Sequence, residues 1–150
     1  KQIPIYKNDF TLWSDTVQKN PTAWMAHYNL ANVFIAEKKV EEAETHYREA
    51  IQIKPDFALA PYNLGNILLT QKKIQEAIIQ YQATIRIKPD FVDAYNNLGV
   101  ALLSDGKTEE AITQFQKALE LKPDFADARN NLDIARRANG SQHDAEPNEQ

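Results

Sequence analysis

The prolines of this chain recur at a fixed interval. Pro21, Pro55, Pro89 and Pro123 are each 34 residues apart, and residues 58–91 are identical to residues 92–125 at 16 of 34 positions. An internal period of this length is typical of helix–turn–helix units, which bury their apolar faces by stacking on one another. The spacing therefore predicts an all-α solenoid of repeated helix pairs.

Each repeat is expected to contain two amphipathic helices. Apolar residues recur every three or four positions, as in Leu64, Ile67 and Leu68, and this places them on one helix face. We expect Gly65 and Gly99 to let the two helices of a pair approach closely. The proline after the second helix should end it, because proline has no amide hydrogen. The aspartate after each proline is expected to cap the next helix. These aspartates are Asp56, Asp90 and Asp124.

Two details of the pattern predict local departures. Gly106 is expected to provide the turn between the helices of the third repeat, where Lys38-Lys39 and Lys72-Lys73 stand in the earlier repeats. Pro61 lies about one turn into its helix, so we expect a bend or a late start there.

Small, aromatic and aliphatic residues stand at fixed offsets in the third copy: Tyr95, Leu98, Gly99, Leu102, Ala111, Phe115, Ala118 and Pro123. This pattern resembles the signature of the tetratricopeptide repeat family. The resemblance implies a right-handed α-solenoid whose first helices line a concave face that binds other proteins. Departures from the signature are modest: Pro61 stands where an aromatic residue is common, and Thr84 replaces a small residue.

The register divides the chain into successive parts. Residues 1–23 are expected to hold a lone second helix from an upstream repeat, with Trp13 and Val17 in register. Because the chain begins at Lys1, we expect it to be part of a longer protein. Gly140 should lie just beyond the last helix. The parts are a half repeat (1–23), three repeats (24–57, 58–91 and 92–125), a C-terminal capping helix (126–140) and a disordered tail (141–150).

Composition excludes several functional classes. The chain has no cysteine and a net charge of −4, which excludes thiolate chemistry and argues against nucleic-acid binding. No apolar run approaches the roughly 18 residues of a membrane span, so no membrane contact by this segment is expected. His27, His46 and His143 form no metal-binding motif. We expect a non-catalytic chain without cofactor or metal, either cytoplasmic or, if membrane spans precede it, extracytoplasmic.

One helix face carries asparagines at the repeat period. Asparagine is a poor residue for a helix interior, so its recurrence needs an explanation. Helical geometry places this face on the concave side, where an amide can donate to a peptide carbonyl and accept from a peptide N–H. We predict that the face binds the backbone of an extended peptide. The candidate binding residues are Tyr28, Asn29, Asn32, Tyr62, Asn63, Asn66, Asn96, Asn97 and Asn131.

The asparagine register resembles the repeats of O-linked N-acetylglucosamine transferase, where such a ladder holds acceptor polypeptides. The matching residues here are Asn29, Asn63, Asn97 and Asn131. Alternatively, these asparagines bond between adjacent helices or to the backbone and fix the pitch of the superhelix; both roles are compatible. A carboxylate clamp of the kind used by chaperone adaptors is disfavoured, because Tyr28, Asp93 and Asn97 occupy the positions of its cations.

The leading segment, residues 8–13, is similar to the block that opens the repeat arrays of O-mannosyltransferase-type membrane proteins. Two alternatives to peptide binding stay open. The apolar edge of the leading half repeat, around Phe10, Trp13 and Val17, could stack on another copy of the chain and so drive end-to-end self-assembly. The resemblance instead implies a substrate-presenting arm of a membrane-bound glycosyltransferase-like protein.

Overall fold

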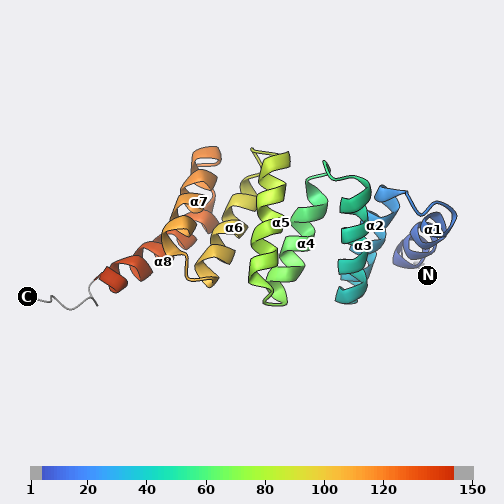
Figure 1. Cartoon of the computed structure of the whole chain (residues 1–150), viewed down its shortest axis with the longest axis horizontal. Coiled ribbons are helices and arrows are strands. Elements are labelled where there is room, and N and C mark those ends of the chain that lie inside the picture. Colours follow the sequence, from blue (N-terminus) through green and yellow to red (C-terminus); the bar gives the residue numbers. More distant parts are fainter. Residues whose placement is uncertain (1–4, 144–150) are drawn as a thin grey trace, which may run out of the picture.

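The computed structural model describes residues 5–143, and within them it contains eight α-helices and no strand (Figure 1). This confirms the all-α architecture. The helices are α1 (Ile5–Lys19), α2 (Trp24–Ala36), α3 (Val40–Ile53), α4 (Leu59–Thr70), α5 (Ile74–Ile87), α6 (Val92–Ser104), α7 (Thr108–Leu121) and α8 (Ala126–His143).

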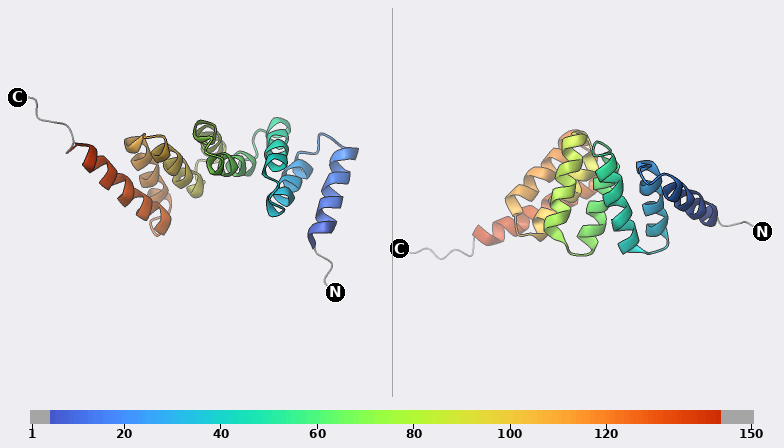
Figure 2. Two further views of the ribbon diagram at one scale, coloured as in Figure 1. Left: turned by 90° about the horizontal axis from the view of Figure 1, so that it is seen from below. Right: turned by 45° about the vertical axis from the view of Figure 1, so that its right-hand side comes forward.

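The helices stack one after another along the long axis of the molecule (Figure 1). Helices α2 and α3, α4 and α5, and α6 and α7 form the tightest pairs, and each pair packs on the next. Helix α4 also packs directly on α6, and α6 on α8, whereas α3, α5 and α7 do not contact one another to that extent. Successive helices come closest on the inner side of a curved stack. The concave face is therefore formed by α2, α4, α6 and α8, and Figure 2 shows the stack from two further sides.

The turns inside the three helix pairs share one geometry. Lys38, Lys72 and Gly106 have φ angles of 61°, 62° and 80°. The next residue in each turn donates its N–H to a carbonyl five residues back, as Lys39 does to Phe34 at 2.9 Å. This is the Schellman arrangement, in which a left-handed residue ends a helix. The expected turn at Gly106 is confirmed, and two lysines adopt the same backbone conformation without the freedom of glycine.

The ends of some helices differ from expectation. The aspartates do not cap the following helices: the residues at the N-caps of α4 and α6 are Ala58 and Phe91, with no side-chain cap bond. Helix α8 continues through Gly140 to His143, so the predicted end at residue 140 is wrong, and the predicted tail overlaps the last helical turn. Its remainder, residues 144–150, lies outside the described residues. Helix α4 begins one residue later in the repeat than α2 and α6, which agrees with the late start expected at Pro61.

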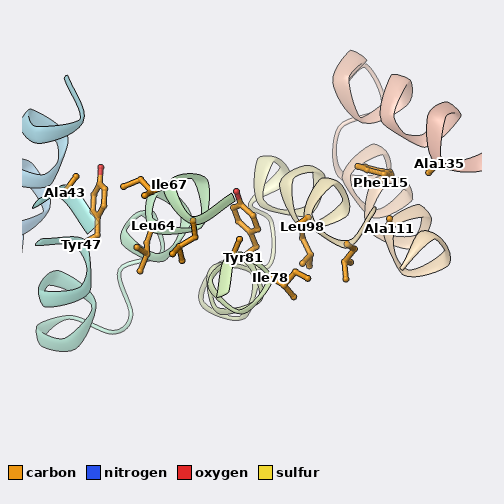
Figure 3. Packing of buried hydrophobic residues seen from close by; sticks show 14 of the residues in the cluster. Ala43, Tyr47, Leu64, Ile67, Ile78, Tyr81, Leu98, Ala111, Phe115 and Ala135 are labelled. Atoms are coloured by element: carbon orange, nitrogen blue, oxygen red, sulfur yellow. The ribbon is translucent and has the colours of Figure 1, made fainter. Parts of the chain in front are cut away.

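The core is a continuous row of side chains between the paired helices (Figure 3). Tyr81 and Phe115 are fully buried and lie against the glycines of the preceding helices. A Cβ atom at Gly65 would stand 2.7 Å from Tyr81 Cε1, and one at Gly99 would stand 2.5 Å from Phe115 Cε1. Both distances are too short for real carbon atoms, so the predicted role of these glycines in close helix approach is confirmed.

Candidate binding surface

The candidate binding residues lie on the concave helices and are half-buried, except Asn96, which is 7% exposed. They are helical residues at equivalent positions of successive repeats, so they form a row along the stack. Most of them are joined by hydrogen bonds to a neighbouring helix. Only the donors and acceptors that these bonds leave unused are available to a ligand.

The first part of the row connects the first and second repeats. Tyr47, from α3, donates its hydroxyl hydrogen to Asn32 Oδ1 on α2. The Nδ2 atom of Asn63 on α4 then donates to Tyr28 OH at 3.2 Å and to Tyr47 OH at 3.4 Å. One asparagine amide thus joins two helices of the preceding repeat.

The second part repeats this arrangement one unit further along. Tyr81 donates to Asn66 Oδ1 at 2.8 Å. Asn97 Nδ2 donates to Tyr62 OH at 3.2 Å and to Asn66 Oδ1 at 3.0 Å. Burial raises the pKa of Tyr47 to about 12 and raises that of Tyr81 as well. Both phenols therefore remain neutral hydrogen donors at physiological pH.

The third repeat keeps the connection but changes its members. Phe115 stands where Tyr81 stands one repeat earlier, Val100 replaces Asn66, and Asn96 replaces Tyr62. Asn131 Nδ2 donates to Asn96 Oδ1 at 2.9 Å, and Asn96 Nδ2 donates to Asn97 Oδ1 at 3.3 Å. Both polar atoms of Asn96 are thus bonded to neighbours, and the residue is 7% exposed, which leaves it little capacity for a ligand.

Asparagine bonding between adjacent helices, one of the two roles expected from the sequence, is confirmed by these contacts. Several amide atoms nevertheless have no partner among the described residues. Asn29 makes no hydrogen bond there at all, and it faces Trp13 across a small pocket of about 200 Å³. None of the free atoms is fully buried. The free groups are the whole amide of Asn29, Oδ1 of Asn63 and Asn131, and Nδ2 of Asn32.

A second recurring contact was missed in the sequence. His27 Nε2 lies 3.0 Å from the carbonyl oxygen of Pro21, Tyr95 OH donates to Pro89 O at 2.9 Å, and Arg129 donates to Pro123 O at 2.6 Å. In each case the side chain lies six residues after the proline and ties the loop to the following helix. The second repeat has Pro61 at this position and therefore no donor. The shared spacing was visible in the sequence, but the three residue types are too different to indicate a common role.

The two histidines of the first repeat are in direct contact. His27 Nδ1 lies 2.9 Å from His46 Nδ1, and Phe34 stacks on the His46 ring with centroids 5.4 Å apart. Because His27 Nε2 faces a carbonyl, the bonds fit a His27 tautomer that donates through Nε2 and accepts from His46 at Nδ1. Burial, and secondarily the neighbouring His27, lower the pKa of His46. Antiparallel pairing of α2 with α3 brings these residues together, which their separation in sequence does not show.

Within residues 5–143, no group of three or more acidic or histidine side chains is arranged to hold a metal ion. Among the same helices, none has both the length and the apolar character that crossing a bilayer requires.

Comparison with known families agrees with the repeat pattern. The tetratricopeptide repeat model matches residues 92–125, and a second TPR repeat model matches residues 31–72 and 65–106. No curated protein sequence shows a significant match to the chain.

Solved structures share the fold at low sequence identity. The crystal structure of MamA is 21% identical with a TM-score of 0.85, and the match covers 90% of this chain and 79% of that one. YrrB, described as a TPR protein with an unusual peptide-binding site, is 21% identical with a TM-score of 0.82, covering 90% and 70%. The first TPR domain of Spaghetti (RPAP3), bound to the HSP90 peptide SRMEEVD, is 23% identical with a TM-score of 0.75, covering 78% and 93%.

Proposed function

Because the chain belongs to the tetratricopeptide repeat family, we propose that it is a protein-interaction module that holds an extended polypeptide along its concave face. The observation that carries this proposal is the row of amide atoms left free on that face after the bonds between helices are made. These atoms include both donors and acceptors, which matches the alternating groups of a peptide backbone.

The spacing of the row suits an extended chain. Neighbouring helices pack about 8–10 Å apart, and an extended peptide advances about 3.3 Å per residue, so one repeat meets roughly every third residue. Each hydrogen bond contributes about 0.5–1.5 kcal/mol net. Three or four such bonds with modest apolar burial correspond to a dissociation constant in the micromolar range.

Peptide recognition also occurs among the similar structures. The RPAP3 domain is bound to the peptide SRMEEVD, which is acidic, and YrrB is described as having a peptide-binding site. The present chain carries Asp93 and Asp127 on its concave helices, so we propose that its partner is not an acidic terminus of that kind. The resemblances to glycosyltransferase repeats remain predictions.

The proposal is tested by selecting binders from a displayed library of random 12-residue peptides and measuring the affinity of the selected peptide for variants. Asn29→Ala is the decisive variant, because Asn29 bonds to nothing among the described residues and its loss leaves the packing intact. We expect the dissociation constant of the selected peptide to be about 2- to 10-fold higher for this variant, the equivalent of one hydrogen bond. The melting temperature of the variant should be unchanged.

Two controls separate binding from stability. Asn63→Ala should weaken binding and also lower the melting temperature, because Asn63 donates to Tyr28 and Tyr47. Gln82→Ala, an exposed change on α5 away from the concave helices, should alter neither. A library without binders, or an affinity that Asn29→Ala does not change, would contradict the proposal.

A further inference from the structure

A pocket of about 730 Å³ opens where the second repeat meets the third. Its walls come from the loop before α4, the end of α5 and the loop before α6. The apolar part of the lining consists of Phe57, Ala58, Leu59, Ile87, Phe91 and Val92. A pocket of this size and character is within the range of small-ligand sites, and it lies outside the asparagine row.

The preceding repeat junction shows what fills the corresponding space. Trp24 occupies the position that Ala58 holds one repeat later, and Phe57 occupies that of Phe91. The indole of Trp24 packs on the ring of Phe57 with centroids 4.7 Å apart. At the next junction alanine replaces tryptophan, so only the second contact of that ring is kept: Phe91 packs on Tyr62 at 4.7 Å, as Phe57 packs on Tyr28 at 4.9 Å. The pocket is therefore the space that an indole occupies one repeat earlier.

The charges around the pocket are arranged unevenly. At the position of Met25 and Leu59, which are 52% and 41% exposed, the third repeat has Asp93 and the last helix has Asp127. The concave edge thus changes from apolar to acidic at the pocket.

The charged groups in the lining differ in whether they are paired. Asp56 forms an ion pair with Lys54 at 2.9 Å, whereas Asp90 and Asp93 have no such partner among the described residues. Lys88 lies over the ring of Phe91 and is 6.0 Å from its centroid, and Lys122 lies similarly over Phe125. Asp93 is close enough to the row of binding residues that it adds to the effect of burial in raising the pKa of Tyr62.

We propose that this pocket binds a large aromatic side chain of the partner peptide, and that a lysine or arginine next to that side chain lies against Asp93 and Asp127. This specificity rests on the proposed function, because the rest of the peptide follows the concave face. It predicts a partner segment with an apolar residue on the α2 side, the aromatic residue at the pocket and a basic residue on the α8 side.

The probe for this site is the blocked dipeptide acetyl-Trp-Lys-amide. Its binding is measured by titrating it into the full chain and recording chemical shifts by heteronuclear NMR. We expect the largest shift changes at residues 57–59 and 87–93. The peptides acetyl-Ala-Lys-amide and acetyl-Trp-Glu-amide are the comparators, and both should bind more weakly. Asp93→Asn should weaken acetyl-Trp-Lys-amide about 2- to 5-fold, as expected for an exposed ion pair, and should leave acetyl-Trp-amide unchanged.

Ala58→Trp is the matched variant, because the chain already accommodates tryptophan at the equivalent position of the first repeat. It should fill the pocket and abolish binding of the probe while the melting temperature is retained. The reverse change, Trp24→Ala, should open a second pocket and produce a new set of shifts around residues 23–25 and 53–59. The second variant keeps the test decisive if the first one folds poorly.

Saturable shifts at the pocket that disappear in Ala58→Trp would support the inference. Shifts elsewhere, or binding that neither variant alters, would overturn it. If the affinity of the library peptide still falls in Asn29→Ala in that case, the pocket inference is wrong and the proposed function stands. If that affinity is unchanged, the pocket inference and the proposed function both fail.

Discussion

In the first two repeats a tyrosine of the second helix donates to an asparagine of the first helix, whereas the third repeat places Phe115 and Val100 at the same two positions. All three rings are almost fully buried, so the apolar packing is alike. The difference is that the first two repeats bury a tyrosine hydroxyl together with an asparagine that accepts its hydrogen, whereas the third repeat buries neither group.

The changes in the third repeat are consistent with one another. Removing the phenol hydroxyl would take away the donor to Asn32, or one of the two donors to Asn66, and an unpaired polar group near the core costs about 1–3 kcal/mol. With valine in place of that asparagine, no such group remains. Asn96 then supplies the acceptor that Asn131 needs. The comparison teaches that the asparagines on this face belong to sets of interacting residues, and only part of their bonding capacity is available to a ligand.

The largest effect is expected at the glycines. Gly99→Ala should destabilise the chain by about 1–3 kcal/mol, the usual cost of overpacking, because the new methyl group would overlap the Phe115 ring. Helix propensity alone predicts the opposite sign, a gain of up to about 1 kcal/mol. Urea unfolding monitored by circular dichroism measures the difference.

The matched control is in the first repeat, where Ala31 stands at the equivalent position. Ala31→Gly should lose the helix propensity, about 1 kcal/mol, together with the packing of a fully buried methyl group, so both changes destabilise although they are chemically opposite. A stabilised Gly99→Ala would show that the rings do not require the glycines.

A smaller effect, of opposite sign, is expected at the turns. Lys72 adopts the left-handed conformation that glycine adopts at position 106 in the third repeat. Lys72→Gly should therefore stabilise the chain, by about 1 kcal/mol, through relief of the strain on a residue with a Cβ atom. The same urea titration detects it, and Lys73→Gly, next to it but outside that conformation, should be destabilising or neutral. Stabilisation by Lys73→Gly rather than Lys72→Gly would refute this account of the turn.

The smallest effect is confined to acidic pH and to the first repeat, which alone ties its loop with a histidine. The pKa of His46 is lowered by burial and by His27, so the unfolded chain takes up a proton at a higher pH than the folded chain does. The stability contributed by the neutral His46 ring is therefore complete above about pH 6.5, the ordinary histidine value, and it declines as the pH falls below that value.

Glutamine occupies the position of His46 in the other two repeats, at Gln80 and Gln114, and His46→Gln is thus the natural control. The free energy of unfolding, measured between pH 7.5 and pH 5, should fall less steeply in this variant than in the parent chain. Parallel pH profiles would rule out a contribution from the pair. Glu49, which opposes the shift weakly, is present in both proteins.

Much of the fold could be predicted from the sequence because it depends on local periodicity. The 34-residue register indicated the helix pairs, the turn at Gly106 and the role of Gly65 and Gly99. The expected caps failed for a local reason: α6 begins at Val92 with Phe91 before it, so Asp90 lies one residue too early to cap it. Helix α8 continues through Gly140 because an exposed glycine inside a helix costs only about 1 kcal/mol.

The sequence predicted which asparagines share one helix face, but not which groups they bond. The register placed Asn63 and Asn97 on one face, yet their partners Tyr28 and Tyr62 belong to the preceding repeat, and which atoms meet depends on the packing of one repeat on the next. The contact between His27 and His46 likewise needs the pairing of α2 with α3. The sequence shows that alanine stands at position 58 where the first repeat has Trp24. That this exchange leaves a pocket beside Phe91 could be seen only in the structure.

The central claim, that tyrosine and asparagine form one unit in the first two repeats, is tested most directly by a double-mutant cycle in the second repeat. The variants are Tyr81→Phe, Asn66→Val and their combination, which recreates the pair found in the third repeat. Asn66→Val alone should cost about 1–3 kcal/mol because the Tyr81 hydroxyl and the Asn97 amide both lose an acceptor; the loss at Asn97 is common to the single and double variants and cancels in the cycle. The combination should cost less than the sum of the single changes by at least about 0.5 kcal/mol. Strictly additive free energies would contradict the claim, since they would mean that the two side chains act independently.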